Sequence, residues 1–142
     1  MTKHTLFYTS CSEEWPTPQE FFDRLDEEFG FTLDPCATGT NAKCPSFFTR
    51  HQDGLQQDWG SNRVICNAPC GKQMRQWASK WLEASKRGAL VVLLAHATTH
   101  TRWFHDFVYG RAELDFIRGR LNFGEAQTSA PFPSQVAVFR AR

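Results

Sequence analysis

Residues 64–95, VICNAPCGKQMRQWASKWLEASKRGALVVLLA, decide the fold of this chain. The opening Val64-Ile65-Cys66 is a short apolar run typical of a buried strand. Over residues 72–87 the apolar side chains recur three and four positions apart, which predicts an amphipathic helix that Gly88 ends. Residues 89–95 form a second apolar run, of the kind that is covered on both faces of a sheet. A strand, a helix and a second strand in this order predict a parallel pair within an α/β sheet.

A second helix is expected upstream of this unit. Thr17 and Glu20 match a capping box, and Pro18 suits the first helical position. Gly30 ends the helix that these residues begin. A short strand over residues 31–33 follows, so the N-terminal part of the chain adds one more helix and one more strand.

The remaining segments complete an α/β fold. Residues 36–62 read as irregular, and a short helix is expected over residues 100–109. The C-terminal strand candidates are residues 113–117, 121–123 and 135–140. We therefore predict one domain, residues 1–142, whose sheet has a parallel centre and an antiparallel C-terminal edge.

Composition limits the function classes. The chain has 142 residues, with 16 basic and 15 acidic side chains and a formal charge of +1. This net charge does not by itself indicate nucleic-acid binding. Its first ten residues lack the apolar segment of a signal peptide, and its longest apolar run, residues 89–95, is far too short to cross a membrane. Five cysteines, an odd number, fit a reduced protein. We therefore expect a cytoplasmic protein with no membrane partner.

Two loops of unusual sequence are expected at the carboxyl ends of strands, where α/β sheets bind ligands near the switch in strand order. Asn67-Ala68-Pro69-Cys70 presents an amide and carbonyls suited to accept both protons of an exocyclic amine, while Asn67 equally suits a plain helix cap. Asp34-Pro35-Cys36-Ala37 presents a carboxylate suited to an ammonium group or a ribose hydroxyl, or else to an Asx turn. Together the loops predict one composite site.

The chain also carries a series of sequence blocks in a fixed order. They are Trp15-Pro16-Thr17-Pro18, Phe21-Phe22, Leu25, residues 28–37, Asn41-Ala42-Lys43-Cys44, Asp53-Gly54-Leu55, Asp58-Trp59, residues 66–71, Trp77, residues 91–94, residues 118–123 and residues 130–134. Together these blocks resemble the phage Dam-type DNA N-6-adenine methyltransferases. The resemblance covers nearly the whole chain. It is specific because several blocks occur in the same order, whereas one short match would not be.

The resemblance implies a compact Rossmann-like domain that transfers a methyl group from S-adenosylmethionine to the exocyclic N6 amine of adenine in DNA. Its catalytic loop would be Asn67-Ala68-Pro69-Cys70. The residues that it places at the cofactor are Trp15, Thr17, Pro18, Asp34, Pro35 and Ala37, with Asp53 or Asp58 at the ribose or adenine. The candidates for contact with double-stranded DNA, chosen on charge and position, are Arg118, Arg120 and Lys72. The short chain leaves little room for a target-recognition domain, so we expect low sequence specificity or specificity lent by an oligomer. As a phage or prophage protein it would act in the bacterial cytoplasm.

The catalytic loop departs from the family's pattern. The family's loop reads Asp or Asn, Pro, Pro and an aromatic residue, whereas this chain reads Asn67-Ala68-Pro69-Cys70. The aromatic residue offers a face to the flipped adenine that is worth roughly 1–3 kcal/mol, and Cys70 has no such area. We expect turnover to be about tenfold to a hundredfold slower, unless Trp59, Trp77 or Trp103 supplies a substitute face.

Other interpretations of single residues stay open. A four-thiolate zinc site would use Cys36, Cys44, Cys66 and Cys70. Only Cys66 and Cys70 have the close spacing of structural zinc sites, so we expect no metal. General-base or surface roles are open for His96, His100 and His105. Trp15 and Trp59, which lie in loops, are candidates for ligand contact.

Two other functions remain as alternatives. The first is a non-catalytic module that kept the fold and binds DNA, the cofactor or a host protein, which the altered loop favours. The second is a methyltransferase that acts on small molecules or proteins. The retained Asn67 and the intact block around Asp34 favour the DNA enzyme over both.

Overall fold

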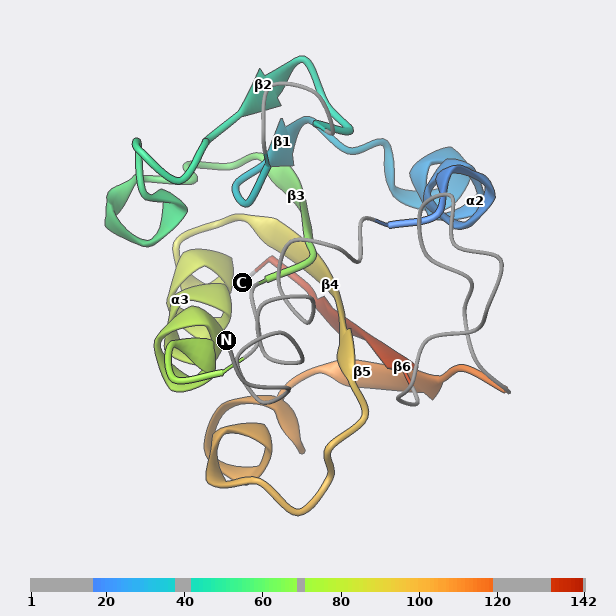
Figure 1. Cartoon of the computed structure of the whole chain (residues 1–142), viewed down its shortest axis with the longest axis vertical. Coiled ribbons are helices and arrows are strands. Elements are labelled where there is room, and N and C mark those ends of the chain that lie inside the picture. The colour runs from blue at the N-terminus through green and yellow to red at the C-terminus, as the bar shows by residue number, and fades with distance from the viewer. Residues whose placement is uncertain (1–16, 38–41, 69–70, 119–133, 142) are drawn as a thin grey trace, which may run out of the picture.

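The computed structural model describes residues 17–37, 42–68, 71–118 and 134–141. Its centre is a six-stranded sheet with the order β2-β1-β3-β4-β6-β5 (Figure 1). The strands are β1 (Leu33–Asp34), β2 (Ser46–Phe47), β3 (Arg63–Cys66), β4 (Leu90–His96), β5 (Glu113–Phe116) and β6 (Ser134–Phe139). The helices are α2 (Gln19–Phe29) and α3 (Met74–Lys86), with two short helical turns, η1 (Gly54–Gln56) and η2 (Phe104–Val108).

The sheet is mostly parallel, as the sequence predicts. β2, β1, β3 and β4 pair in parallel, whereas β6 pairs antiparallel with both β4 and β5. Because β6 opposes both of its neighbours, β5 runs in the same direction as β4. The α/β class, the parallel centre and the antiparallel pairing of the C-terminal strands are therefore confirmed.

The smallest strands differ from the prediction. The strand expected over residues 31–33 is found at Leu33–Asp34, so Asp34 belongs to the sheet itself. β2 lies in the segment that was expected to be irregular, and it pairs with β1 through two residues. A strand of two residues has no period that a sequence pattern can reveal. The strand expected over residues 121–123 lies outside the described residues.

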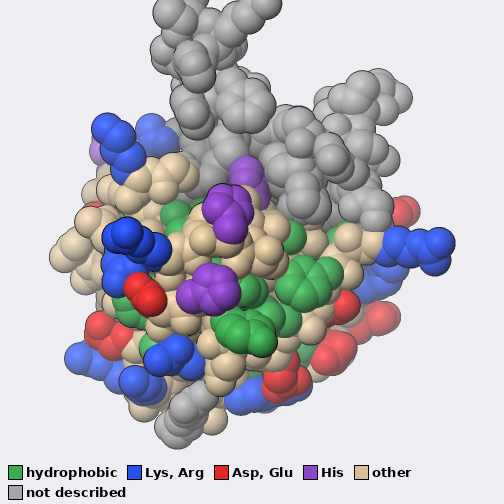
Figure 2. Space-filling view, turned by 90° about the horizontal axis from the view of Figure 1, so that it is seen from below, with side chains coloured by type: hydrophobic (Ala, Val, Ile, Leu, Met, Phe, Trp, Pro, Cys, Tyr) green, Lys and Arg blue, Asp and Glu red, His purple; other side chains and the backbone are tan. Residues whose placement is uncertain are grey.

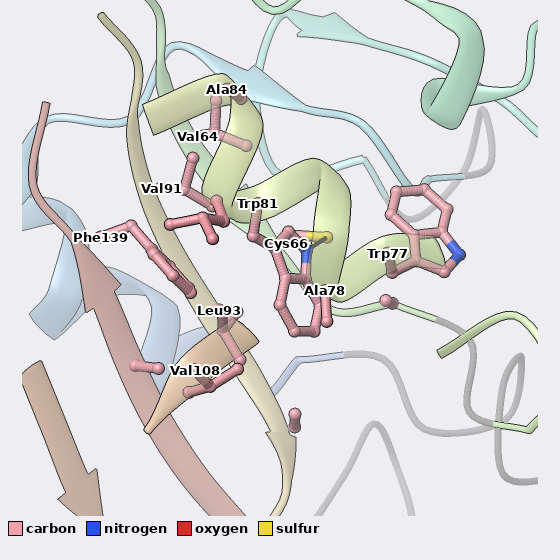
Figure 3. Packing of buried hydrophobic residues seen from close by; sticks show 14 of the residues in the cluster. Val64, Cys66, Trp77, Ala78, Trp81, Ala84, Val91, Leu93, Val108 and Phe139 are labelled. Carbon is pink, nitrogen blue, oxygen red and sulfur yellow. Dashed lines mark hydrogen bonds between the residues drawn. The ribbon is translucent and has the colours of Figure 1, made fainter. Parts of the chain in front are cut away.

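Helix α3 and the turn η2 cover one face of the sheet. As predicted, the buried residues of α3 recur three and four positions apart, and they include Met74, Trp77, Ala78, Trp81 and Leu82. Trp81 is the centre of this core: its indole nitrogen donates to the thiol of Cys66 in β3 at 3.3 Å, as Figure 3 shows. The ring also packs against Phe139 of β6, with ring centroids 6.5 Å apart. β3, α3 and β4 thus form the predicted strand–helix–strand unit.

Helix α2 covers the other face, on the opposite side of the sheet in Figure 1. Phe22 and Phe29 bury their rings against a cluster that includes Ile65, Val92 and Val138. Successive residues of a strand point to opposite faces. The side chains of β4 and β6 therefore divide between the two cores, which fixes which residues can face α2 and which can face α3.

The start of α2 corrects one prediction. Pro18 is the N-cap rather than the first helical residue, and it makes no side-chain capping hydrogen bond. The predicted capping box is wrong, since the Thr17 hydroxyl accepts a hydrogen bond from the Asn67 amide instead. Gly30 ends the helix in the left-handed conformation, at φ 65°, as expected. None of the helices in the described part of the chain has the length and apolar character to cross a membrane.

Candidate active site

The order of the strands reverses between β1 and β3. From β1 the chain moves outward to β2, then returns to the other side of β1 to form β3 and continues to β4. Parallel sheets bind ligands at such a switch, outside the carboxyl ends of the strands. Asp34 ends β1 and Asn67 follows directly after β3. The two loops predicted from the sequence therefore lie at one edge of the sheet, on either side of the switch.

Asn67 is tied to the segment that leads into α2. Its side-chain nitrogen donates to Thr17 Oγ1 at 3.2 Å, although the two residues are far apart in the sequence. Thr17 is buried and Asn67 is half-buried. The bond assigns the donor end of the amide to Thr17, so the carbonyl Oδ1 is the acceptor end. The bond therefore restrains the orientation of the amide at the edge of the sheet.

Asp34 carries a buried carboxyl group at the same edge. Its Oδ1 accepts from the Cys36 backbone N–H at 3.3 Å and its Oδ2 from the Lys43 N–H at 3.1 Å. Burial raises the pKa of this carboxyl, while the two N–H bonds and the positive charge of Lys43 oppose the rise. The bond from Cys36 is the Asx turn that the sequence offered as the plain alternative. Since a carboxylate can accept about four hydrogen bonds, this turn leaves acceptor capacity for a cationic ligand.

Gly54 brings a third loop against the Asp34 loop. A Cβ added to Gly54 would lie 2.2 Å from the carbonyl oxygen of Pro35, so only glycine fits this contact. Asp53, which precedes it, adopts φ 54° and caps η1 by accepting from the Leu55 N–H at 3.1 Å. Asp53 itself is exposed. It therefore lies beside the Asp34 loop with its carboxylate open to solvent.

Asp58 belongs to a different part of the molecule. Its carboxylate accepts from the Gly60 N–H at 2.8 Å, in a turn that leads toward the beginning of β3. In the same turn Asn62 bonds to the Trp59 carbonyl and to the hydroxyl of Thr32, just before β1. These contacts lie at the amino ends of the strands. Of the two acidic candidates, Asp53 is thus the one near the carboxyl edge.

The other predicted cofactor residues divide between the described and the undescribed parts. Pro35 and Ala37 are buried, and the Ala37 N–H donates to the Phe48 carbonyl at 3.1 Å, which holds the loop after β1 against β2. Pro18 is half-buried at the start of α2. Ala68 is buried in the core under α3. The predicted site residues that lie outside the described residues are Trp15, Pro69, Cys70 and Arg120.

The tryptophans separate into core and surface. Trp59 and Trp77 are 1% and 4% exposed and pack on each other with ring centroids 6.4 Å apart. The prediction that Trp59 contacts a ligand is therefore wrong, because its indole nitrogen donates to the Gly54 carbonyl inside the core. Trp103 is only half-buried. It is the one tryptophan of the described residues that keeps a surface near the carboxyl edge.

Basic residues surround a hollow at the start of α3. The hollow has a volume of about 410 Å³, and its lining includes Lys72, Arg75, Arg102 and Trp103. In Figure 2, which views the molecule from the η2 side, Lys and Arg side chains gather where α3 lies, beside a central group of histidines. Arg118 is exposed just after the carboxyl end of β5. Sequence reasoning singled out Lys72 but missed Arg75 and Arg102, because only the packing of η2 on α3 brings them together.

The described cysteines behave as buried thiols. Cys36, Cys44 and Cys66 are free. Burial raises the pKa of the Cys36 and Cys44 thiols to about 12, and it raises that of Cys66 well above its usual value. Within the described ranges, no group of three or more His, Cys, Asp or Glu side chains is placed to hold a metal ion.

Comparison with known families identifies the family of this chain. The family model described as DNA N-6-adenine-methyltransferase (Dam) matches residues 5–138, almost the whole chain. The chain belongs to the Dam family. It is thus an adenine-specific DNA methyltransferase, and the resemblance drawn from the sequence blocks is confirmed.

Two known proteins are similar in sequence to this chain. The DNA N-6-adenine-methyltransferase of Haemophilus phage HP1 (strain HP1c1) is 28% identical over 141 residues, which cover 94% of this chain and 82% of the phage protein. YfdM of Escherichia coli (strain K12), provisionally named as a methyltransferase, is 38% identical over 48 residues, or 33% of this chain and 53% of its own length. The phage enzyme shows that the similarity runs from end to end.

The Gly54 contact gives a test of how this Dam-family site is built. We expect Gly54→Ala to lower the free energy of unfolding by about 1–3 kcal/mol, since the added Cβ forces apart two packed loops. Urea denaturation followed by tryptophan fluorescence measures the change. Gly30→Ala is the matched control, because its φ of 65° is strained but nothing lies within 4 Å of the added Cβ. A Gly54→Ala protein as stable as the wild type would contradict the contact.

Proposed function

We propose that this chain transfers a methyl group from S-adenosylmethionine to the N6 amine of adenine in double-stranded DNA, using the site between β1 and β3. The observation that carries the proposal is the hydrogen bond between Thr17 and Asn67, which fixes an amide beside the switch in strand order. The parallel strands, the helices on both faces and the buried carboxyl at the switch together support a Rossmann-like methyltransferase domain.

The residues at the switch fit the proposed cofactor. S-adenosylmethionine carries a cationic ammonium and a cationic sulfonium, and it supplies the methyl group from the sulfonium. Asp34 is 6% exposed, so its charge is costly without a cationic partner, and a ligand ammonium would supply one. Asp53 is placed to reach a ribose hydroxyl from the neighbouring turn. Thr17, Pro35 and Ala37 complete the walls, and Trp15 and Pro18 are further contacts that the resemblance implies.

Asn67 is proposed to orient the adenine. Its carbonyl Oδ1 accepts one proton of the N6 amine, and a carbonyl of the loop near Pro69 accepts the other. Both bonds turn the nitrogen lone pair out of conjugation with the ring and toward the methyl carbon. With S-adenosylmethionine bound, its sulfonium would supply the methyl group to this nitrogen, S-adenosylhomocysteine would be the leaving group, and the amine would release one proton to solvent. The protein's part is orientation and exclusion of water.

Lys72 and Arg118 are the proposed DNA contacts among the described residues, with Arg120 beyond them. β5 runs in the same direction as β4, so Arg118 follows a carboxyl end on the same edge as Asn67. Phosphate contacts from this edge position the duplex without reading its sequence. We propose that the enzyme acts in the bacterial cytoplasm as a single domain of residues 1–142, and that an oligomer adds specificity if single copies show none.

The altered loop gives the second candidate function its support. Ala68 and Cys70 replace a proline and an aromatic residue of the family's loop. A loop without an aromatic face holds a flipped base less firmly. A non-catalytic module that binds DNA, the cofactor or a host protein is therefore the alternative to be tested beside the enzyme.

Transfer of a labelled methyl group to unmethylated duplex DNA tests the proposal. We expect the wild type to transfer methyl to adenine, and Asn67→Ala to lose at least about a hundredfold, because an acceptor used in the transition state is removed. Cys70→Tyr restores an aromatic face and is expected to raise turnover by about tenfold to a hundredfold. Asn62→Ala, a change of the same type at the opposite edge, is the control.

The outcomes separate the two functions. Transfer that disappears in Asn67→Ala supports the proposed site. No transfer by the wild type, with transfer gained in Cys70→Tyr, shows an intact scaffold with an impaired loop. If neither protein transfers methyl or binds S-adenosylhomocysteine, the enzyme proposal fails and the binding module takes its place.

Thr17→Val tests whether the buried hydroxyl positions Asn67. We expect kcat to fall by about two- to tenfold, the equivalent of one neutral hydrogen bond, with little change in the KM for DNA. Thr17→Ser keeps the hydroxyl and should retain wild-type kcat. Steady-state methyl transfer measures both variants. An unchanged kcat in Thr17→Val, or an equal loss in both, would mean that this bond does not position the amide.

A further inference from the structure

The hollow at the start of α3 directly follows the catalytic loop. Gly71 and Lys72 line it and come next in the chain after Pro69 and Cys70. Its other wall comes from η2 and the residues before it, which pack against α3. With a volume of about 410 Å³, it falls in the range of roughly 300–1,000 Å³ that suits small ligands or a single nucleotide.

The charges around the hollow suit an anion. Lys72, Arg75 and Arg102 line it, against one acidic residue, Asp106. Arg75 is paired with Asp106 at 2.8 Å, and its guanidinium lies 4.9 Å from the ring centre of Phe107. Those two contacts neutralise Asp106 and hold Arg75 in place. The charges of Lys72 and Arg102 are then left for a ligand, since neither forms an ion pair within the described residues.

Trp103 adds an aromatic surface to the same hollow. Its ring stands edge-on to Trp81, at 6.2 Å, and to Phe104, at 6.2 Å, so its orientation is set by the core under α3. Trp103 is half-buried and belongs to the lining. A rigid indole beside two cations is the combination with which proteins hold single-stranded nucleic acid, through base stacking and phosphate contact.

We propose that this hollow binds the nucleotide that flanks the target adenine, with its phosphate on Arg102 and Lys72 and its base against Trp103. The inference rests on the proposed function for the identity of the ligand, and it names how the strand is held. It also bears on the altered loop: Trp103, the residue before η2, supplies an aromatic contact to the strand in a chain that has no aromatic residue at position 70. The hollow is a strand-binding site and not part of the cofactor site at Asp34.

Binding of a short fluorescein-labelled duplex, followed by fluorescence anisotropy over a series of salt concentrations, tests the phosphate contact. We expect Arg102→Ala to weaken binding by roughly three- to tenfold and to lower the slope of log affinity against log salt by about 0.9. Arg87→Ala is the matched control, because Arg87 is exposed at the other end of α3 and pairs only with Glu83 among the described residues. It should leave both quantities unchanged.

A single-stranded oligonucleotide tests the stacking contact. We expect Trp103→Ala to weaken its binding by about five- to a hundredfold, and Trp103→Phe to stay close to the wild type. Thermal unfolding of both variants shows whether the loss comes from the core instead. Since Trp103 packs on Trp81, a loss of DNA binding in Trp103→Ala counts only if that variant remains folded. Arg102→Ala tests the hollow without changing this core contact.

Calorimetry with S-adenosylhomocysteine separates a failure of this inference from a failure of the proposed function. We expect Arg102→Ala and Trp103→Ala to bind S-adenosylhomocysteine as the wild type does. Equal DNA binding by Arg102→Ala and Arg87→Ala would overturn the inference even if the wild type transfers methyl groups. Lost DNA binding in Arg102→Ala without any methyl transfer by the wild type would support the hollow while the enzyme proposal fails. The absence of DNA binding by the wild type would also overturn the inference.

Discussion

The parallel pairing of β1 with β3 is the constraint on which the rest of this molecule depends. Leu33 and Val64 are register partners, so the ends of two strands that are separated by the whole β2 and η1 region lie side by side. The pairing brings Asp34 and Asn67 to one edge and leaves room there for the segment that holds Thr17. Gly54 can then pack against Pro35, and α3 can begin directly after the loop that follows Asn67. Without this pairing, Asp34 and Asn67 would not lie at the same edge of the sheet.

Much of this arrangement follows from the sequence. The helix over α3 and the strand over β4 were predictable because their patterns are long: thirteen residues with helical spacing and seven residues of continuous apolar character. β2 was not predictable, because two residues carry no period. The role of Thr17 was also hidden. A Thr before Pro18 and Glu20 matches a helix cap, and only the tertiary contact with Asn67 shows that the hydroxyl is used elsewhere.

The candidate site was predicted in part for the same physical reason. Strand ends in a parallel sheet meet at one edge, so Asp34 and Asn67 could be placed together from the chain order alone. The burial of Trp59 could not be predicted in this way. The residue lies in a loop by sequence, yet its indole is inside the core because Gly54 offers it a carbonyl. Arg75 and Arg102 show the converse, since the packing of η2 against α3 joins two arginines that no local pattern connects.

The structure also changes how the departure from the family's catalytic loop is viewed. Position 70 carries a cysteine instead of an aromatic residue, but Trp103 lines the hollow at the start of α3 with three basic residues and is held there by Trp81 of the core. In the functions proposed above, orientation of the adenine by Asn67 and retention of the strand by the hollow are therefore separate tasks on separate elements. The cofactor is proposed to bind between β1 and β3, and a crystal structure with S-adenosylhomocysteine tests this placement. We expect the ligand's ammonium at Asp34 and its sulfur facing Asn67. A ligand bound in the hollow at α3, or at the amino ends of the strands near Asp58, would contradict it.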